Sequence, residues 1–308
     1  MSGRGGGDLA EGQTLAGTGW FVRYANFVKL PHTLFALPFA LVGVALGSFG
    51  SDVSPATVGW VVLAFTAARF AAMGFNRIAD RAFDARNPRT AMRELPAGTM
   101  SVREASAAVT VSAALFVFAA WMINPLCFAL SPVALAWVFF YSYTKRFTRW
   151  SHLVLGLGLG IAPVGGYLAV TGSWSDPWWM LVALAGAVMT WTAGFDIIYS
   201  VQDVDIDRAE GLHSLPSRIG REPALSAARG LHVLTVLALA TVGFAMGTGR
   251  YYYIGAFVAA IALVYEHALV RKGNLQKAFF VVNMALSTVF LVFVLLERAL
   301  PYAPVWQR

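Results

Sequence analysis

Charge is scarce in this chain of 308 residues, of which 13% are charged and 58% are hydrophobic. A soluble domain has about 25% charged residues, so this sequence lacks the charge needed to cover a water-facing surface. Cysteine is almost absent: Cys127 lies in an apolar run, which excludes a disulfide framework and indicates a packing residue. The Gly-rich, polar residues 1–19 lack the apolar core of a signal peptide and are predicted to be a disordered tail.

Long apolar runs are abundant, and each is close to the roughly 20 residues that a helix needs to cross a bilayer. Nine can be marked, at residues 30–50, 57–79, 103–122, 124–143, 152–171, 178–200, 224–246, 251–270 and 277–297. They predict an all-α integral membrane protein with one transmembrane domain, residues 20–308, built as a nine-transmembrane-helix bundle. Glycines recur in the fifth run and predict close helix approach; they are Gly156, Gly158, Gly160, Gly165 and Gly166.

The basic residues behind the net charge of +7 are unevenly distributed. If the nine runs cross the membrane in alternate directions, 19 of the 23 Lys and Arg residues fall on the side of the N-terminus. The positive-inside rule then predicts a cytoplasmic N-terminus, and the charge indicates topology rather than a nucleic-acid partner. Two long polar loops, after the second and sixth runs, lie on the same side, and such loops are usually functional. We expect the chemistry at the cytoplasmic face.

The second run ends in three polar residues spaced by four, Asn76, Asp80 and Asp84. A helix would stack these side chains on one face. A solvated helix end would explain the same carboxylates if they paired with the arginines beside them, Arg77 and Arg81.

The sixth run ends in a similar motif. Asp196, Tyr199 (or Ser200), Asp203 and Asp207 share one face of a continued helix, and Asp205 points away. Carboxylates at this spacing repel one another, more strongly near lipid, so a cation is needed to neutralise them. Oxygen ligands suit Mg²⁺, which takes one or two carboxylates together with substrate phosphates. Two such helix faces predict Mg²⁺ ions held around one diphosphate.

The loops after the two motifs repeat each other. Each is basic and contains Gly and Pro, in residues 89–98 after the first motif and residues 211–220 after the second. The last Asp lies 14 residues before the closing Gly in the first case and 13 in the second. This repeat favours one site shared by both motifs over two unrelated solvated helix ends.

On these residues the chain resembles the UbiA superfamily of intramembrane prenyltransferases, over about residues 21–297. The family's two Asp motifs and its Tyr-x-x-x-Lys-Arg signature match Asn76, Asp80, Asp84, Arg93, Asp196, Tyr199, Asp203, Asp207, Tyr141, Lys145 and Arg146. The resemblance implies a nine-helix fold in the cell inner membrane. It also implies Mg²⁺-dependent transfer of a prenyl chain from its diphosphate to an acceptor.

Three residues depart from the family pattern: Arg77 where many members have Asp, Glu94 where many have Pro, and His213 where a Lys is common. The stretch Arg-Glu-Leu-Pro-Ala-Gly looks most like the 4-hydroxybenzoate polyprenyltransferase branch, some members of which are thought to serve the futalosine route to menaquinone. The implied acceptor is a hydroxylated aromatic carboxylate of ubiquinone or menaquinone biosynthesis, 4-hydroxybenzoate or 1,4-dihydroxy-6-naphthoate. Haem, a chlorophyllide, homogentisate and a glycerol phosphate lipid are the alternatives within the family.

The resemblance implies a role for each matched residue. Mg²⁺ would be bound by Asp80, Asp84, Asp203 and Asp207, with Asn76 as a direct or supporting ligand. Phosphate oxygens would be gripped by Arg89, Arg93, Lys145 and Arg146, although the positive-inside rule alone would also explain Lys145 and Arg146.

The remaining roles concern the acceptor and the carbocation. Arg69, inside the second run, would bind the acceptor's carboxylate or neutralise the Asp cluster. Asp196 would take the phenolic proton or raise the electron density of the ring, and Tyr141 and Tyr199 would stabilise the carbocation by cation–π contact.

A membrane transporter is the main alternative from another class, because membrane carboxylates also mark ion pathways. Transporter sites lie near the midplane on broken helices, whereas these acids lie at cytoplasmic helix ends. We therefore expect an enzyme whose partners are polyprenyl diphosphate, the aromatic acceptor and the bilayer, with no nucleic acid and no obligate protein partner. The histidines have no metal-ligand spacing and are expected at polar edges; they include His152, His232 and His267.

Overall fold

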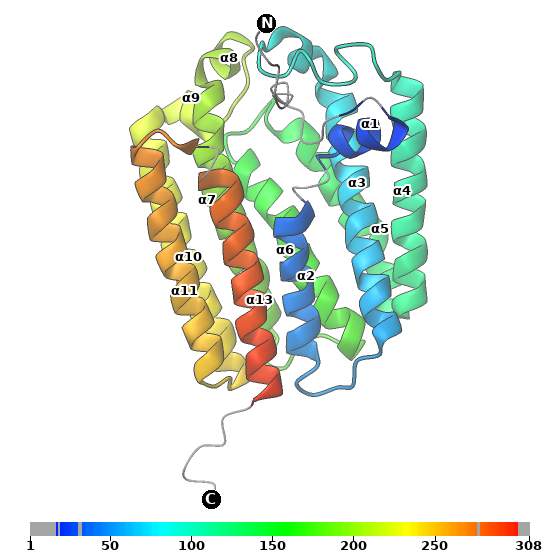
Figure 1. The fold of residues 1–308 in the computed structure, drawn as a ribbon, viewed down its shortest axis with the longest axis vertical. Helices are drawn as coiled ribbons and strands as arrows, with labels where there is room; N and C mark the ends of the chain where they lie inside the picture. Colours follow the sequence, from blue (N-terminus) through cyan, green and yellow to red (C-terminus); the bar gives the residue numbers. More distant parts are fainter. Residues whose placement is uncertain (1–16, 18, 30–32, 276–277, 301–308) are drawn as a thin grey trace, which may run out of the picture.

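Helices make up most of the described chain, residues 17, 19–29, 33–275 and 278–300, in the computed structural model (Figure 1). The expected N-terminal tail lies almost wholly outside these residues. Within them the protein is helical without strands, which confirms the all-α membrane fold. The helices are α1 (Trp20–Phe27), α2 (Thr33–Gly47), α3 (Pro55–Arg86), α4 (Val102–Ile123), α5 (Pro125–Thr144), α6 (Ser151–Thr171), α7 (Trp179–Ser200), η2 (Val201–Asp203), α8 (Val204–Ala209), α9 (Leu215–Ile219), α10 (Arg221–Met246), α11 (Arg250–Arg271), the π-helix η3 (Ala278–Val282) and α13 (Asn283–Ala299).

Eight of the helices in the described part of the chain are long and apolar enough to cross a membrane. They correspond to eight of the nine expected runs. The first expected run, residues 30–50, contains α2, a helix of 15 residues that is shorter than the usual span. The number of nine crossings therefore stays a prediction.

Local signals set the helix ends that the structure shows. The Ser54 hydroxyl accepts the Thr57 N–H and caps α3, with Pro at the first helical position. Ser101 and Glu104 form a reciprocal capping box at the start of α4. Asn124 ends α4 and, through its side-chain oxygen, caps α5 in the same short connection. These caps fix the tight hairpins that hold neighbouring helices antiparallel.

Helix α7 lies at the centre of the bundle and packs on α6 and α10, while α2 packs between α6 and α13. Glycines allow the closest of these contacts, as expected for the fifth run. A Cβ at Gly156 would overlap the α7 backbone, and one at Gly166 would overlap the α2 backbone. Large buried side chains fill the centre, among them Phe39, Trp191 and Phe290.

The short helices and long connections gather at one end of the bundle, opposite the end where α13 finishes at Ala299 (Figure 1). We call this the polar end; it comprises the connections 87–101, 145–150 and 201–220. Helix α3 has 32 residues, about 48 Å at 1.5 Å per residue, and is longer than the ~30 Å hydrocarbon core. Its last turns therefore extend to the polar end and carry the first Asp motif with them.

Candidate active site

The first motif lies on the last three turns of α3, and the helix stacks its side chains as the spacing predicts. Asn76 Nδ2 donates to Asp80 Oδ2 at 2.9 Å, one turn further along. Asp84 follows one turn later and is buried. The amide and two carboxylates thus form one polar stripe that runs out of the apolar part of the bundle.

These two carboxylates do not pair with the arginines beside them in the sequence. Arg146, at the end of α5, donates to Asp80 at 3.3 Å, and Arg93, in the loop after α3, donates to Asp84 at 2.6 Å. Arg77 instead donates through Nε to the backbone carbonyl of Phe27 at 3.2 Å. The interpretation of the motif as a solvated helix end paired with its own neighbours is therefore wrong.

The second motif is not one continuous helix, contrary to the spacing argument. Helix α7 ends at Ser200, a 3₁₀ turn holds Asp203, and α8 carries Asp207. The tighter turn changes the angular position of the residues that follow it. Asp203 and Asp207 are nevertheless both buried, while Asp205 is exposed and points away as expected.

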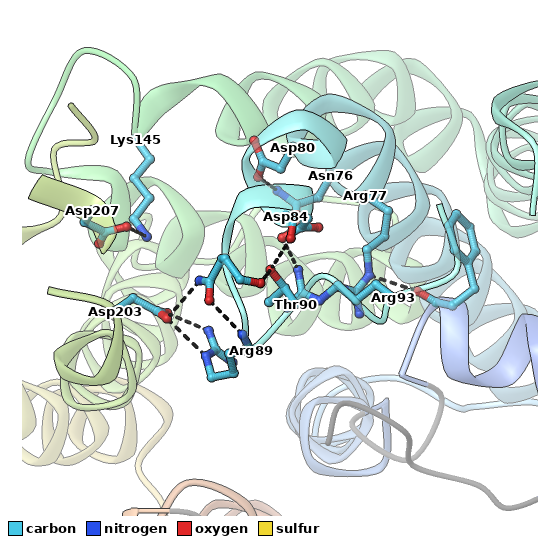
Figure 2. A network of polar contacts seen from close by, with 12 residues as sticks. Asn76, Arg77, Asp80, Asp84, Arg89, Thr90, Arg93, Lys145, Asp203 and Asp207 are labelled. Atoms are coloured by element: carbon cyan, nitrogen blue, oxygen red, sulfur yellow. Dashed lines mark hydrogen bonds and ion pairs between the residues drawn. The ribbon is translucent and has the colours of Figure 1, made fainter. Parts of the chain in front are cut away.

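Cations from other elements reach both carboxylates of the second motif (Figure 2). Arg89, in the loop after the first motif, holds Asp203 with two hydrogen bonds, from Nε at 3.0 Å and from Nη2 at 2.6 Å. Arg89 Nη1 donates to the Tyr199 hydroxyl at 3.2 Å, and the guanidinium carbon lies over the Tyr199 ring. Lys145 Nζ lies 2.9 Å from Asp207 Oδ1. Burial opposes the charge of Arg89, but the hydrogen bonds and charge of Asp203 outweigh it and raise the pKa of this arginine.

The four carboxylates predicted to bind metal are thus each paired with a cation; they are Asp80, Asp84, Asp203 and Asp207. Three of these cations connect the two halves of the internal repeat. Arg89 links the first loop to the second motif, and the adjacent Lys145 and Arg146, just after α5, reach one motif each. The structure brings these predicted site residues together at the polar end from four separate segments of the chain.

The oxygen ligands present suit Mg²⁺, although no metal cage is preformed. Among the described residues, no three His, Cys, Asp or Glu side chains converge closely enough to hold an ion by themselves. Asp207 Oδ2 is buried and has no hydrogen-bond partner there, so one acceptor atom is available to a cation. Since Mg²⁺ usually binds one or two carboxylates plus substrate phosphates, this set fits an ion that arrives with a diphosphate.

Three predicted residues lie deeper in the bundle than the ion pairs. Arg69 is partly buried and lies seven residues before Asn76, and Asp196 is partly buried and lies seven residues before Asp203. Tyr141 of α5 is also partly buried and lies one helical turn before Lys145.

The expectation that the histidines lie at polar edges is wrong for His152 and His232, which are each 3% exposed. His152 contacts Asp196 Oδ2 through Nδ1 at 2.6 Å. Its spacing from Asp196 in the sequence carries no signal, because the two residues meet only when α6 packs on α7.

Sequence reasoning also missed residues that position the site. Asn87 bonds Asp203 through Nδ2 at 3.3 Å and accepts the Arg89 N–H, so the first loop is ordered around the second motif. Lys29, just after α1, is surrounded by arginines: burial, together with Arg77, Arg93 and Arg89, lowers its pKa to about 7. Asn87 begins the run Asn-Pro-Arg-Thr at residues 87–90, beside the predicted Arg89, and this run was a usable signal, whereas nothing near Lys29 in the sequence predicted its place.

Comparisons with known proteins identify the family of this chain. The model of the UbiA prenyltransferase family matches residues 36–294. The 4-hydroxybenzoate octaprenyltransferase of Sodalis glossinidius is 32% identical over 278 residues, which cover 88% of this chain and 90% of that one. The enzyme of the same name from Aeromonas salmonicida is 34% identical over 243 residues, 77% of this chain and 83% of that one.

Solved structures extend the similarity to the fold. The apo structure of a UbiA homologue from Aeropyrum pernix K1 superposes with a TM-score of 0.80 at 33% identity, covering 86% of this chain and 98% of that one. A UbiA homologue from Archaeoglobus fulgidus, solved with GPP and Mg²⁺, gives a TM-score of 0.66 at 22% identity over 90% of this chain and 100% of that one. By sequence and by fold, this chain belongs to the UbiA prenyltransferase family.

Proposed function

We propose that this protein transfers a polyprenyl group from polyprenyl diphosphate to a hydroxylated aromatic carboxylate, in a Mg²⁺-dependent reaction at the cytoplasmic face of the cell membrane. The observation that carries the proposal is the set of four carboxylates, each opposed by a cation, that two helix ends bring together at the polar end. Relatives named 4-hydroxybenzoate octaprenyltransferase, at 32% and 34% identity, support the acceptor class.

The ion pairs suggest how the donor binds. Asp80, Asp84, Asp203 and Asp207, with Asn76 beside them, would hold the metal. The cations that pair with these carboxylates would bind the phosphate oxygens instead, because the arginine fork fits a phosphate group. They are Arg89, Arg93, Lys145 and Arg146. The chemistry that Mg²⁺ supplies when bound is neutralisation of the leaving diphosphate.

The deeper residues suggest where the acceptor lies. Arg69 and Asp196 offer one cation and one anion, and each lies about two helical turns before the first expected metal-binding residue on its own segment. A hydroxylated aromatic carboxylate has one group for each: the carboxylate for Arg69 and the hydroxyl for Asp196. Tyr141 and Tyr199, between the two layers, would stabilise the allylic carbocation by cation–π contact.

The same fold also serves other acceptors. A digeranylgeranylglyceryl phosphate synthase superposes with a TM-score of 0.67, but at 19% identity this likeness concerns the fold alone. The sequence relatives above 30% identity favour the aromatic class. Both 4-hydroxybenzoate, a ubiquinone precursor, and 1,4-dihydroxy-6-naphthoate, a menaquinone precursor, carry the required pair of groups.

The test uses washed membranes that contain the protein, given a polyprenyl diphosphate, Mg²⁺ and either acceptor, with products identified by mass. A prenylated product from one acceptor, abolished by EDTA and by the double change Asp80→Ala/Asp203→Ala, is the expected result. Absence of product with both acceptors, together with no Mg²⁺-dependent loss of the donor, would overturn the proposal.

A further inference from the structure

His152 lies in the first turn of α6 and connects Asp196 to the second loop. Its Nδ1 is 2.6 Å from Asp196 Oδ2, and its Nε2 accepts the backbone N–H of Leu215 at 3.1 Å. A backbone amide can only donate, so Nε2 carries no proton and Nδ1–H donates to Asp196. These two partners assign a neutral imidazole in a single tautomer and orientation.

The loop that holds His152 is the one that follows Asp207. The N–H of Leu212 donates to the Asp207 carbonyl at 2.7 Å, and the N–H of His213 donates to the Lys145 carbonyl at 2.7 Å. Leu215 then begins α9, directly after these bonds. The segment that closes around the second motif therefore also sets the orientation of His152.

Asp196 differs in its partner from the other two carboxylates on its face of the second motif. Asp203 and Asp207 are held by Arg89 and Lys145, which are cations, whereas Asp196 is held by a neutral imidazole. A neutral donor fixes the position of a carboxylate without cancelling its charge. Asp196 thus keeps the negative charge that a proton acceptor needs.

We propose that His152 is a positioning residue: it holds one oxygen of Asp196 so that the other binds the hydroxyl group of the aromatic acceptor. The inference rests on the proposed function and adds selectivity for hydroxylated rings. In the reaction, the donor C1–O bond breaks and its electron pair leaves with the diphosphate, while a ring carbon bonds to C1. The hydroxyl proton moves to Asp196 and returns to the oxygen when the ring carbon loses its own proton to water, so one proton is released overall.

The test compares three variants of the purified protein with geranyl diphosphate and Mg²⁺. His152→Leu removes both hydrogen bonds, and His152→Gln keeps one donor and one acceptor. His232→Leu is the matched control, because His232 is equally buried and packs on Gly194 of α7, two residues from Asp196. For each protein, KM and kcat are measured with 4-hydroxybenzoate, and the inhibition constant is measured for benzoate, which lacks the hydroxyl.

In His152→Leu we expect kcat to fall about 10- to 100-fold. Losses of this size are found when a residue that orients a metal-binding side chain by a hydrogen bond is removed, and His152 orients Asp196 in the same way. KM for 4-hydroxybenzoate should rise about tenfold, while the benzoate constant and the donor KM stay unchanged. His152→Gln should recover most of the loss, and His232→Leu should lower the melting temperature without changing the preference for 4-hydroxybenzoate over benzoate.

The preference for 4-hydroxybenzoate over benzoate distinguishes a positioning role of His152 from a general role in packing. Equal weakening of both aromatic acids in His152→Leu, or the same result in His232→Leu, would overturn the role of His152 while leaving the proposed function intact. A wild-type protein that prenylates no hydroxylated aromatic acid would instead overturn the proposed function and this inference with it.

Discussion

Two aspartates on one short helix allow the site to be tested with a matched pair of substitutions. Asp207 and Asp205 both lie in α8, but the Asp207 side chain is 3% exposed and bonded to Lys145, whereas Asp205 is exposed. Replacing either by Asn removes one negative charge and keeps the side-chain shape. Only Asp207→Asn removes a carboxylate from the cluster that faces the donor.

The size of the effect follows from these contacts. Loss of the Asp207 charge leaves Lys145 without its counterion; because Lys145 is about a third exposed, solvent screens this loss to about 1–2 kcal/mol of stability. Catalysis should suffer more, since removing one group that stabilises developing charge costs about 10²–10³ in kcat. We expect kcat/KM to fall more than about 100-fold in Asp207→Asn, equivalent to about 2.7 kcal/mol. Asp205→Asn should change it by less than about threefold, as expected for a solvated surface position.

The assay is prenyl transfer in detergent with a titration of Mg²⁺, and thermal unfolding is measured on the same samples. Asp207→Asn should also require more Mg²⁺ for half-maximal rate, because a metal-holding oxygen has lost its charge. If both variants lose activity equally, or if Asp207→Asn keeps wild-type activity and Mg²⁺ dependence, Asp207 does not hold the metal and the reasoning fails.

Three other results are expected. Arg89→Lys should raise the KM for the prenyl diphosphate donor about tenfold, because lysine cannot form the bidentate hydrogen bonds that arginine makes to a carboxylate or phosphate. Arg86, whose side chain is about half exposed and pairs with Glu210, is the control, and Arg86→Lys should have little effect on this KM. Glu266→Leu should lower the free energy of unfolding by about 1–3 kcal/mol in thermal unfolding, because the buried Asn283 amide loses one of its two acceptors and keeps only the Ala278 carbonyl, and Glu266→Gln should not. The pKa of Lys29 falls from 10.5 to about 7 on folding, so the unfolded chain binds more protons than the folded protein between these two pH values. The free energy of unfolding therefore rises with pH across this window. Lys29→Met should flatten that rise in melting curves recorded between pH 7 and 10. Unchanged curves would show that Lys29 is not desolvated.

Local rules predicted most of the helices because hydropathy and capping act over short distances. The run 103–122 is α4, residues 102–123, and its capping box is readable in the sequence. The run 57–79 fell short of α3, which continues to Arg86, because hydropathy declines where the polar motif begins although the helix does not end there. The i, i+4 stacking of Asn76 and Asp80 was predictable for the same local reason.

Contacts between distant segments could not be predicted from spacing. The repeat indicated that two motifs and two basic loops share one site, yet it could not say that Arg89 of the first loop meets Asp203 of the second motif. The 3₁₀ turn at Val201–Asp203 contains no Gly or Pro, so the sequence gives no local signal that helix α7 ends there. His152 meets Asp196 only because glycines let α6 and α7 approach closely, so its role depends on packing rather than on sequence.

The departure at Arg77, where many family members have Asp, illustrates how the structure changes the reading of a motif. Position 77 is one residue after Asn76, which turns it about 100° around α3, away from the stripe of Asn76, Asp80 and Asp84. Its guanidinium is buried and donates to the Phe27 carbonyl at the end of α1. The substitution therefore removes no oxygen from the carboxylate stripe and instead fastens α1 against the polar end, so the departure is compatible with a complete donor site.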